Sequence, residues 1–435
     1  MKKINIGIIG FGTVGSGTAQ VLHDQLERMA RRSGIELVLK TVVEQFPRDL
    51  PEPFADVPLI TSMAELCSDP AIDIVVELIG GLEPARTFVL QAIEAGKHVV
   101  TANKALLSEH GMEIFAAANK AGVEVGFEAS VGGGIPVIKA MKEGLVANRI
   151  DSIRGILNGT ANYILSKMTS DGAPFAEVLK EAQEKGFAEA DPTYDVEGID
   201  TAHKLVILMT MAYGMPVRLS DVSIEGISAI EPTDINFAKA FGHRIKLLAI
   251  SRNHGDHVEA RVHPTLVPED HLLAAINGPM NSVHIHGDMV GDILLYGAGA
   301  GKMPTGSAVV ADIMDIARNI DRDSVNRVPA LSYLPEEMRP RVITPMEQLR
   351  CPYYFRFSTV DAPGVLATIA GILGKHDISI ESVIQKGREA GKTVPIVMHT
   401  HEAQEAAVEK ALAEINSLDI ITADTVKIRV LTGGE

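Results

Sequence analysis

Asp200 and Lys204, two ionisable residues whose spacing suits proton transfer, lie in the stretch DTAHKLVILMTMA. On an α-helix, residues four positions apart share one face, and the order acid before base is the favoured one. The residues after Lys204 are apolar on every side, which is typical of a buried helix. A lysine in the first turn of such a helix is partly withdrawn from water and is a candidate for proton transfer. A surface ion pair is the plainer interpretation of the same spacing.

Acidic residues crowd the sequence before this helix. The segment 185–200, KGFAEADPTYDVEGID, contains Glu189, Asp191, Asp195 and Glu197. Grouped carboxylates suit an ammonium ion, because charge-assisted hydrogen bonds are the strong ones. We expect Glu189 and Asp195 to bind the amino group of an amino-acid substrate, while Asp191 and Glu197 receive no role.

A glycine-rich loop near the N-terminus predicts a dinucleotide cofactor. GFGTVG at 10–15 follows an apolar, β-branched run at 4–9 and precedes a helical pattern through Val21 and Leu26. Glycines in a turn between a strand and a helix let the backbone approach a pyrophosphate at the positive helix N-terminus. This context favours NAD(P). A hydride carrier also requires a proton donor, which strengthens the hypothesis for Lys204.

The choice between NAD and NADP stays open. A second strand, 36–43, ends at Glu44, whose carboxylate would bind a ribose hydroxyl and favour NAD. Arg48 lies nearby and would instead meet the 2′-phosphate of NADP. Glu44 also comes later than the usual spacing of about 20 residues.

Strands and helices continue to alternate after this point, with a strand at 72–79, a helix at 84–95 and a strand at 98–101. This order predicts a doubly wound parallel sheet whose ligands bind at the carboxyl ends of the strands. Lys104 follows one of those ends, and we expect it to reach the cofactor or the substrate. The alternative is a solvated loop lysine.

A second glycine run, SVGGGIP at 130–136, follows an expected strand at 123–129. The carbonyl oxygens that such a run exposes, together with the Glu128 carboxylate, are ligands that suit a hard cation. On residue types alone, an ordinary flexible turn is the simpler explanation.

The pattern changes near residue 150. We expect a strand at 153–157, a turn at 158–160, a helix at 161–168 and an amphipathic helix at 174–185 that ends at Gly186. Further strands are expected at 224–230, 246–250, 258–262, 282–285 and 293–295. Together they predict a second sheet with helices on it, inserted into the nucleotide domain.

The glycines at 297–301 do not form a phosphate loop, because Met303 stands where Ser or Thr is needed. We expect this loop to pass close to the cofactor before the helix 307–316 returns to the first domain. The scattered histidines, His284 and His286 among them, have no matching carboxylates or cysteines, which argues against a zinc site.

The C-terminal quarter reads as a separate unit. Residues 321–350 are rich in proline and charge and predict a linker. Beyond them we expect strands at 354–359, 378–385, 394–400 and 425–430 and helices at 365–375 and 403–416. The order βαββαβ is the ferredoxin-like pattern. The predicted domains are residues 1–137 completed by 299–320, then 138–298, the linker 321–350, and 351–435.

Composition limits the function. The 435 residues carry a net charge of -16 and no basic cluster, which disfavours nucleic acid as a partner. Cys67 and Cys351 lack metal-ligand spacing and indicate a reducing compartment, the cytoplasm. Glycines interrupt the apolar N-terminus, which we read as a strand rather than a signal peptide. No apolar stretch of about 20 residues predicts a membrane span.

With all parts in view, the chain resembles homoserine dehydrogenases of the long form, which carry a C-terminal ACT domain. The resemblance covers nearly the whole chain. Its carriers are GFGTVG at 10–15, TANK at 101–104, EASVGGGIP at 128–136, NGT at 158–160 and KGFAEADPTYDVEGIDTAHK at 185–204. In the ACT region they are DAPGVLATIAGIL at 361–373 and HDISIESV at 376–383.

The resemblance implies interconversion of L-homoserine and L-aspartate 4-semialdehyde, with NAD or NADP as hydride carrier. It implies catalytic roles for Lys204 and Asp200. It implies substrate binding by Glu189, Asp195, Asp200, Thr160 and Gly186. It implies cofactor binding by Gly10, Phe11, Gly12, Thr13, Val14, Gly15, Lys104, Gly186 and Gly301.

The resemblance also implies a monovalent cation, sodium, and an amino-acid effector, threonine. The cation ligands would be Glu128 and the carbonyls of Val131, Gly133 and Ile135. The regulatory residues would be Asp361, Gly364, Val365, Leu366 and Ile378. Many ACT domains have Asn before the second strand, where this chain has His376 and Asp377. We expect a homodimer or homotetramer.

Aldehyde reduction needs a hydride at carbon and a proton at oxygen. We expect Asp200 to keep Lys204 charged, so that reduction runs near neutral pH and oxidation needs alkaline pH. Two alternatives remain: another NAD(P)-dependent oxidoreductase of a small amino-acid substrate, which need not carry the acidic stretch, and a non-catalytic amino-acid sensor, which would not need Lys204.

Overall fold

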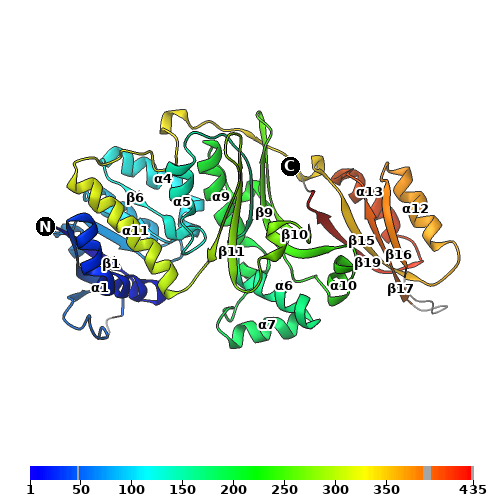
Figure 1. Ribbon diagram of the computed structural model, residues 1–435, viewed down its shortest axis with the longest axis horizontal. Helices are drawn as coiled ribbons and strands as arrows, with labels where there is room; N and C mark the ends of the chain where they lie inside the picture. The colour runs from blue at the N-terminus through cyan, green and yellow to red at the C-terminus, as the bar shows by residue number, and fades with distance from the viewer. Residues whose placement is uncertain (47–48, 386–392, 433–435) are drawn as a thin grey trace.

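The computed structural model describes residues 1–46, 49–385 and 393–432. Three units follow one another along its long axis, with the N-terminus in the first and helices α12 and α13 at the opposite end (Figure 1). The predicted fold class is confirmed: a Rossmann-type nucleotide domain, an inserted α+β domain and a ferredoxin-like C-terminal domain. No helix within the described ranges is long and apolar enough to cross a membrane.

The first unit contains a six-stranded parallel sheet in the order β3-β2-β1-β4-β5-β6. Its strands are β1 (Lys2–Ile9), β2 (Ile35–Val43), β3 (Leu59–Ile60), β4 (Ile74–Glu77), β5 (His98–Thr101) and β6 (Val125–Gly126). Its main helices are α1 (Thr13–Ser33), α3 (Ala85–Glu94), α4 (Lys104–Ala121) and α11 (Lys302–Asp321). The strand order reverses between β1 and β4, and sheets of this kind bind ligands at the carboxyl ends near that point.

Helix α11 returns from the second domain to the first and packs on α1, as predicted. Two glycines make the close approach possible. A Cβ atom at Gly17 would lie 2.2 Å from the carbonyl oxygen of Lys302, and one at Gly306 would lie 2.7 Å from the carbonyl carbon of Gly17.

The expected strand at 123–129 is wrong beyond Gly126. The chain leaves the sheet there and coils into a short 3-10 helix, Glu128–Ser130, in which the Ser130 N–H donates to the carbonyl of Phe127. The extended pattern in the sequence therefore marks burial rather than strand pairing.

The second unit carries one part of an eleven-stranded sheet, whose main path is β12-β11-β7-β9-β10-β19-β15-β17-β16. Its strands are β7 (Ile150–Ile156), β8 (Ser223–Ile224), β9 (His243–Asn253), β10 (His257–Pro268), β11 (Met280–Gly287) and β12 (Gly291–Ala298). Its helices include α6 (Gly159–Asp171), α7 (Phe175–Glu184), α8 (Thr193–Val196), α9 (Ile199–Tyr213) and α10 (Pro232–Ala240).

Two local predictions in this unit are wrong. The turn expected at 158–160 is the first turn of α6, because the Asn158 side chain caps the helix by accepting the Ala161 N–H at 2.7 Å. The strand expected at 224–230 ends at Ile224. The Glu225 N–H still donates to the carbonyl of Val262 on β10, but the Ile227 N–H donates to the carbonyl of Val196 instead.

The third unit has the predicted βαββαβ order. Its elements are β15 (Tyr353–Val360), α12 (Val365–Lys375), β16 (Ile380–Gln385), β17 (Thr393–Thr400), α13 (Glu405–Asn416) and β19 (Ile421–Val430). It does not stand apart, however. Strand β19 pairs in parallel with β10, through Thr265 with Arg429 and Leu266 with Val430, so that the two domains share one sheet.

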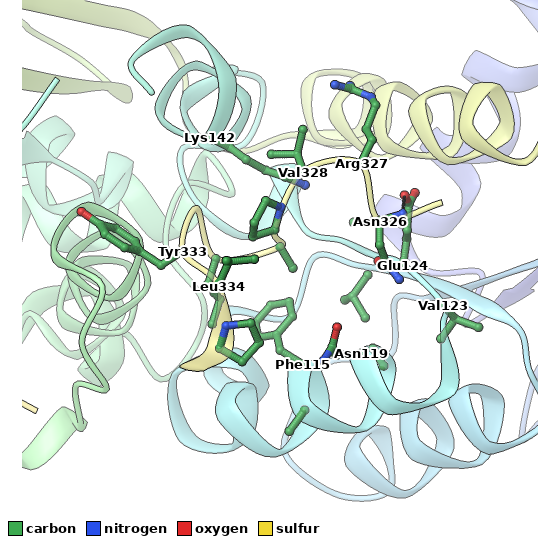
Figure 2. A pocket seen from close by; sticks show the side chains of 18 of the residues that line it. Phe115, Asn119, Val123, Glu124, Lys142, Asn326, Arg327, Val328, Tyr333 and Leu334 are labelled. Atoms are coloured by element: carbon green, nitrogen blue, oxygen red, sulfur yellow. Dashed lines mark hydrogen bonds between the residues drawn. The ribbon is translucent and has the colours of Figure 1, made fainter. Parts of the chain in front are cut away.

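The segment expected as a linker, 321–350, packs on both preceding domains. The Asn326 N–H donates to Glu124 at 2.6 Å, the Tyr333 hydroxyl donates to the carbonyl of Ala212 at 3.3 Å, and β13 (Val342–Ile343) pairs with β10. A cavity of about 180 Å³ lies between this segment, α4 and α11, as Figure 2 shows. None of the residues predicted to bind substrate or cofactor lines it.

Candidate active site

Lys204 and Asp200 form the predicted pair on the first turns of α9. The Lys204 ammonium donates to Asp200 Oδ2 at 2.6 Å and to the carbonyl oxygen of Leu157 at 2.6 Å. The two side chains are only 9% and 7% exposed, so this is no surface ion pair. An ammonium group has three N–H donors, and among the residues that the structure describes these two contacts use two of them.

A second lysine meets the same carboxylate. Lys104, the first residue of α4 in the nucleotide domain, lies with its ammonium 2.8 Å from Asp200 Oδ1. Asp200 thus bridges two lysines from two domains, at the carboxyl end of β5 where the sequence predicted a ligand-facing lysine. Lys104 is 42% exposed and can reach a bound molecule.

Asn158 ties the cluster together, and the sequence analysis missed it. Its side-chain amide donates to Asp195 Oδ1 at 2.7 Å and to Asp200 Oδ2 at 2.9 Å, while its oxygen caps α6. The only signal in the sequence was its place in the NGT motif. The Leu157 carbonyl was equally invisible, because the sequence pattern does not indicate where a carbonyl points.

The environment separates the proton affinities of these groups. The ammonium groups of Lys204 and Lys104 outweigh burial and hold the pKa of Asp200 well below its usual range. Burial lowers the pKa of Lys204, and Asp200 only partly offsets this. Asp200 raises the pKa of Lys104. Of the two lysines, Lys204 is therefore the easier to deprotonate. The expectation that Asp200 keeps Lys204 charged took no account of burial.

The predicted substrate residues gather around this trio. Burial raises the pKa of Asp195, whose partner is Asn158. Thr160 donates to the carbonyl of Phe187 at 2.6 Å, which fixes the turn that follows Gly186. Glu189 is exposed and close enough to Lys104 to raise its pKa.

The two acids left without a role have structural partners. Asp191 accepts the N–H and the hydroxyl of Thr193, the first residue of the short helix α8. Glu197 accepts the hydroxyl of Ser228 at 2.7 Å. His203, which the sequence analysis did not single out, is buried beside Lys204, and burial lowers its pKa.

The glycine loop lies between β1 and α1 as predicted. Gly10 has φ +91°, and a Cβ atom at Gly15 would lie 2.0 Å from the Gly10 carbonyl oxygen, so the turn is tight. Gly12 has open space where a side chain would be, at the N-terminus of α1, which with Thr13 and Val14 suits a pyrophosphate. The Phe11 N–H donates to the Glu44 carboxylate. Arg48 lies outside the described residues.

Two glycine loops from distant parts of the chain meet near α11. The Gly134 N–H donates to the carbonyl of Ala298 at 3.0 Å, and a Cβ at Gly133 would lie 2.4 Å from the carbonyl oxygen of Gly299. Gly301, with φ +124°, then begins α11. The predicted cation loop and the predicted cofactor loop are therefore neighbours.

The predicted cation ligands are only partly suited to the role. Both carboxylate oxygens of Glu128 accept backbone N–H groups, from Ile138 at 2.8 Å and Lys139 at 2.9 Å. The carbonyl oxygen of Ile135 accepts a hydrogen bond from the Val137 N–H. Of the four predicted ligands, the carbonyl oxygens of Val131 and Gly133 are the two best suited to a hard cation. Within the described ranges no group of three or more His, Cys, Asp or Glu side chains is arranged to hold a metal.

The predicted regulatory residues lie around α12. Gly364, with φ +90°, begins the helix, Val365 is buried and Leu366 is 37% exposed. Asp361 Oδ2 is buried without a hydrogen-bond partner in the part of the chain that the structure describes. Ile378 is buried after the helix, before β16.

Comparison with known proteins now decides the family. The sequence profile of the homoserine dehydrogenase catalytic domain matches residues 136–314, that of the homoserine dehydrogenase NAD-binding domain matches 10–128, and that of the ACT domain matches 353–419. The chain is 48% identical to homoserine dehydrogenase of Neisseria gonorrhoeae over 99% of each chain. The chain belongs to the homoserine dehydrogenase family.

Solved structures of homoserine dehydrogenases agree with this. The crystal structure of a homoserine dehydrogenase from Thiobacillus denitrificans superposes with a TM-score of 0.94 at 49% identity, covering 100% of this chain and 99% of that one. A hyperthermophilic archaeal homoserine dehydrogenase in complex with NADPH superposes with a TM-score of 0.62 at 27% identity and covers 72% of this chain and 97% of that one. The resemblance stated from the sequence is confirmed. The predicted activity is confirmed with it: an NAD(P)-dependent oxidoreductase that acts on the homoserine hydroxyl or the corresponding aldehyde.

Proposed function

We propose that Lys204 is the proton donor and acceptor in the interconversion of L-homoserine and L-aspartate 4-semialdehyde. The observation that carries this is the geometry of Lys204. Its Nζ lies 2.6 Å from Asp200 Oδ2 and 2.6 Å from the Leu157 carbonyl oxygen, and its third N–H has no partner among the described residues. General acid–base catalysis by a positioned group contributes about 10²- to 10⁴-fold. Asp200 acts as the counterion that orients it.

The remaining roles follow from charge and position. The carboxylates of Glu189 and Asp195 bind the substrate ammonium, and Thr160 and Gly186 shape the wall of the substrate site. Lys104 binds at the border of substrate and cofactor, because it links the nucleotide domain to Asp200 at 2.8 Å. During reduction Lys204 gives its proton to the developing alkoxide, and during oxidation it takes the proton from the hydroxyl.

The nucleotide binds along residues 10–15, and Gly301 closes the site from the other side. The bound nicotinamide supplies or accepts the hydride. NADP or NAD serves as cofactor. The bond between Phe11 and Glu44 supports a ribose at this position, because it holds the acidic group at the end of β2 against the glycine loop.

We infer four further properties. A monovalent cation, sodium, binds the carbonyls of Val131 and Gly133, which supports the contact between the two glycine loops. Threonine is the effector, and the buried oxygen of Asp361, which has no hydrogen-bond partner among the described residues, supports an amino-acid site beside α12. The protein forms a homodimer or homotetramer, which the exposed apolar residues Val290 and Tyr296 of the β11–β12 hairpin support. It works in the cytoplasm, where its two free cysteines stay reduced.

Initial rates decide the proposal. Homoserine-dependent reduction of NAD and of NADP would be measured in sodium and in choline chloride, with and without threonine. Turnover of homoserine in wild-type protein and its loss in Lys204→Met is the expected result. If another small hydroxy amino acid is oxidised faster than homoserine, the assignment of homoserine as the substrate is wrong.

A further inference from the structure

Two buried arginines of the C-terminal domain reach across the shared sheet into the catalytic domain. Arg429, on β19, donates to both carboxylate oxygens of Glu225, at 2.8 Å each. Arg356, on β15, donates to Asp234 at 2.6 Å and to Glu231 at 2.8 Å. Arg429 is 3% exposed and Arg356 10% exposed, so both contacts fix position as well as charge.

From the first contact, a chain of hydrogen bonds continues to the turn before the active-site helix. The residues after Glu225 lie against the turn that precedes α9. The Ile227 N–H donates to the carbonyl of Val196 at 2.8 Å, and the Ser228 hydroxyl donates to Glu197 Oε1 at 2.7 Å. This gives Glu197, which the reaction itself does not use, a structural function.

The two segments touch without spare room. A Cβ atom at Gly226 would lie 2.7 Å from the Val196 carbonyl oxygen. Gly198 has φ +82°, and a Cβ atom there would lie 3.2 Å from Ile224 and 3.1 Å from Val262. A shift of the segment 224–228 therefore moves the turn 196–198.

That turn sets the catalytic geometry. Gly198 is the residue that begins α9, two positions before Asp200, and Asp195 lies just ahead of it. Asp200 and Asp195 both bond to Asn158, and Asp200 holds Lys204. A misplacement of about 1 Å at such a group can cost about 10²-fold in rate.

Arg429 also binds within its own C-terminal domain, on the other side of the seam, by which we mean the boundary between that domain and the catalytic domain. It donates to Glu405 at 2.6 and 2.9 Å, at the first residue of α13 in the C-terminal domain. One guanidinium thus connects α13 with Glu225. Arg356 instead bonds to the first turn of α10, a helix that packs on β9 and α6.

We propose that Glu225 and Arg429 are positioning residues for the active site, and that the C-terminal domain supports the start of α9 through them. A change in the position of α13 reaches Asp200 and Lys204 by this route. The inference rests on the proposed role of Lys204.

A matched pair of variants tests it. Glu225→Gln and Glu231→Gln each weaken one arginine contact across the seam at a partly exposed glutamate, 42% and 59% exposed respectively. We expect Glu225→Gln to lower kcat for homoserine about tenfold with an unchanged KM for the cofactor, and Glu231→Gln to leave both near wild type. Amide exchange over 196–204 should become faster in Glu225→Gln alone.

Arg429→Lys, which keeps the charge but not the two-pronged contact, should fall between wild type and Glu225→Gln. Equal effects of the two glutamine variants on kcat and on exchange would overturn the proposal, since a general loosening of the seam would then explain both. So would a Glu225→Gln protein with wild-type kinetics and exchange. If the wild type does not turn over homoserine, the proposed reaction fails, whereas exchange over 196–204 still tests the positioning.

Discussion

Replacement of Asp200 by Asn should move the pH dependence of homoserine oxidation toward acid. In that direction Lys204 must be deprotonated, so the rate rises with pH through the pKa of Lys204. The Asp200 carboxylate, 2.6 Å from the ammonium, raises that pKa against the effect of burial. Without the carboxylate the charged form loses its counterion, and the pKa of Lys204 falls.

The magnitude follows from the contacts. A close opposite charge changes a pKa by about 1 to 3 units. Lys104, whose ammonium is 2.8 Å from the other carboxylate oxygen, already lowers the pKa of Lys204 in the wild type, so the change comes from the loss of the carboxylate. We expect the rising limb of kcat/KM to move down by about 1 to 3 pH units, while the maximal rate falls because Lys204 loses its orientation.

The assay is kcat/KM for homoserine from about pH 6 to about pH 11, a range that brackets ordinary lysine titration. Asp191→Asn is the control, because Asp191 lies in the same acidic stretch but, within the described part of the chain, bonds only to Thr193. Its limb should coincide with wild type. A limb that stays in place in a folded Asp200→Asn protein would refute Lys204 as the titrating base.

Three further predictions concern catalysis, binding and stability. Lys204→Met should lower kcat about 10²- to 10⁴-fold in both directions, whereas Lys246→Met, which removes another buried lysine bonded to a carbonyl, should retain most of it in the same steady-state assay. Glu189→Leu should raise KM for homoserine about tenfold and leave KM for the cofactor unchanged; equal changes would remove Glu189 from the substrate site. Gly17→Ala should destabilise by about 1 to 3 kcal/mol in thermal unfolding, because its Cβ would lie 2.2 Å from a carbonyl of α11, whereas Gly144→Ala, with nothing within 4 Å, should not.

Local patterns were reliable where neighbours in sequence are also neighbours in space. The pair Asp200 and Lys204 lies on one turn of α9, so its spacing alone predicted the contact. The glycine loop at 10–15 and the βαββαβ order rest on the same kind of signal. The strand expected at 224–230 failed because its backbone turns to bond with α8, where the Ile227 N–H donates to the carbonyl of Val196, rather than continue along β10.

The sequence by itself determined the family, the nucleotide loop and the pairing of Lys204, our proposed proton donor, with Asp200, because these depend on short motifs and helical spacing. Tertiary structure alone decided how deeply Lys204 is buried, and therefore the direction of its pKa. It also decided that Leu157 supplies a carbonyl from 47 positions away and that Arg429 meets Glu225 across 204 positions. Such contacts depend on the pairing of β10 with β19 and on the packing of whole domains, which leave no periodicity in the chain.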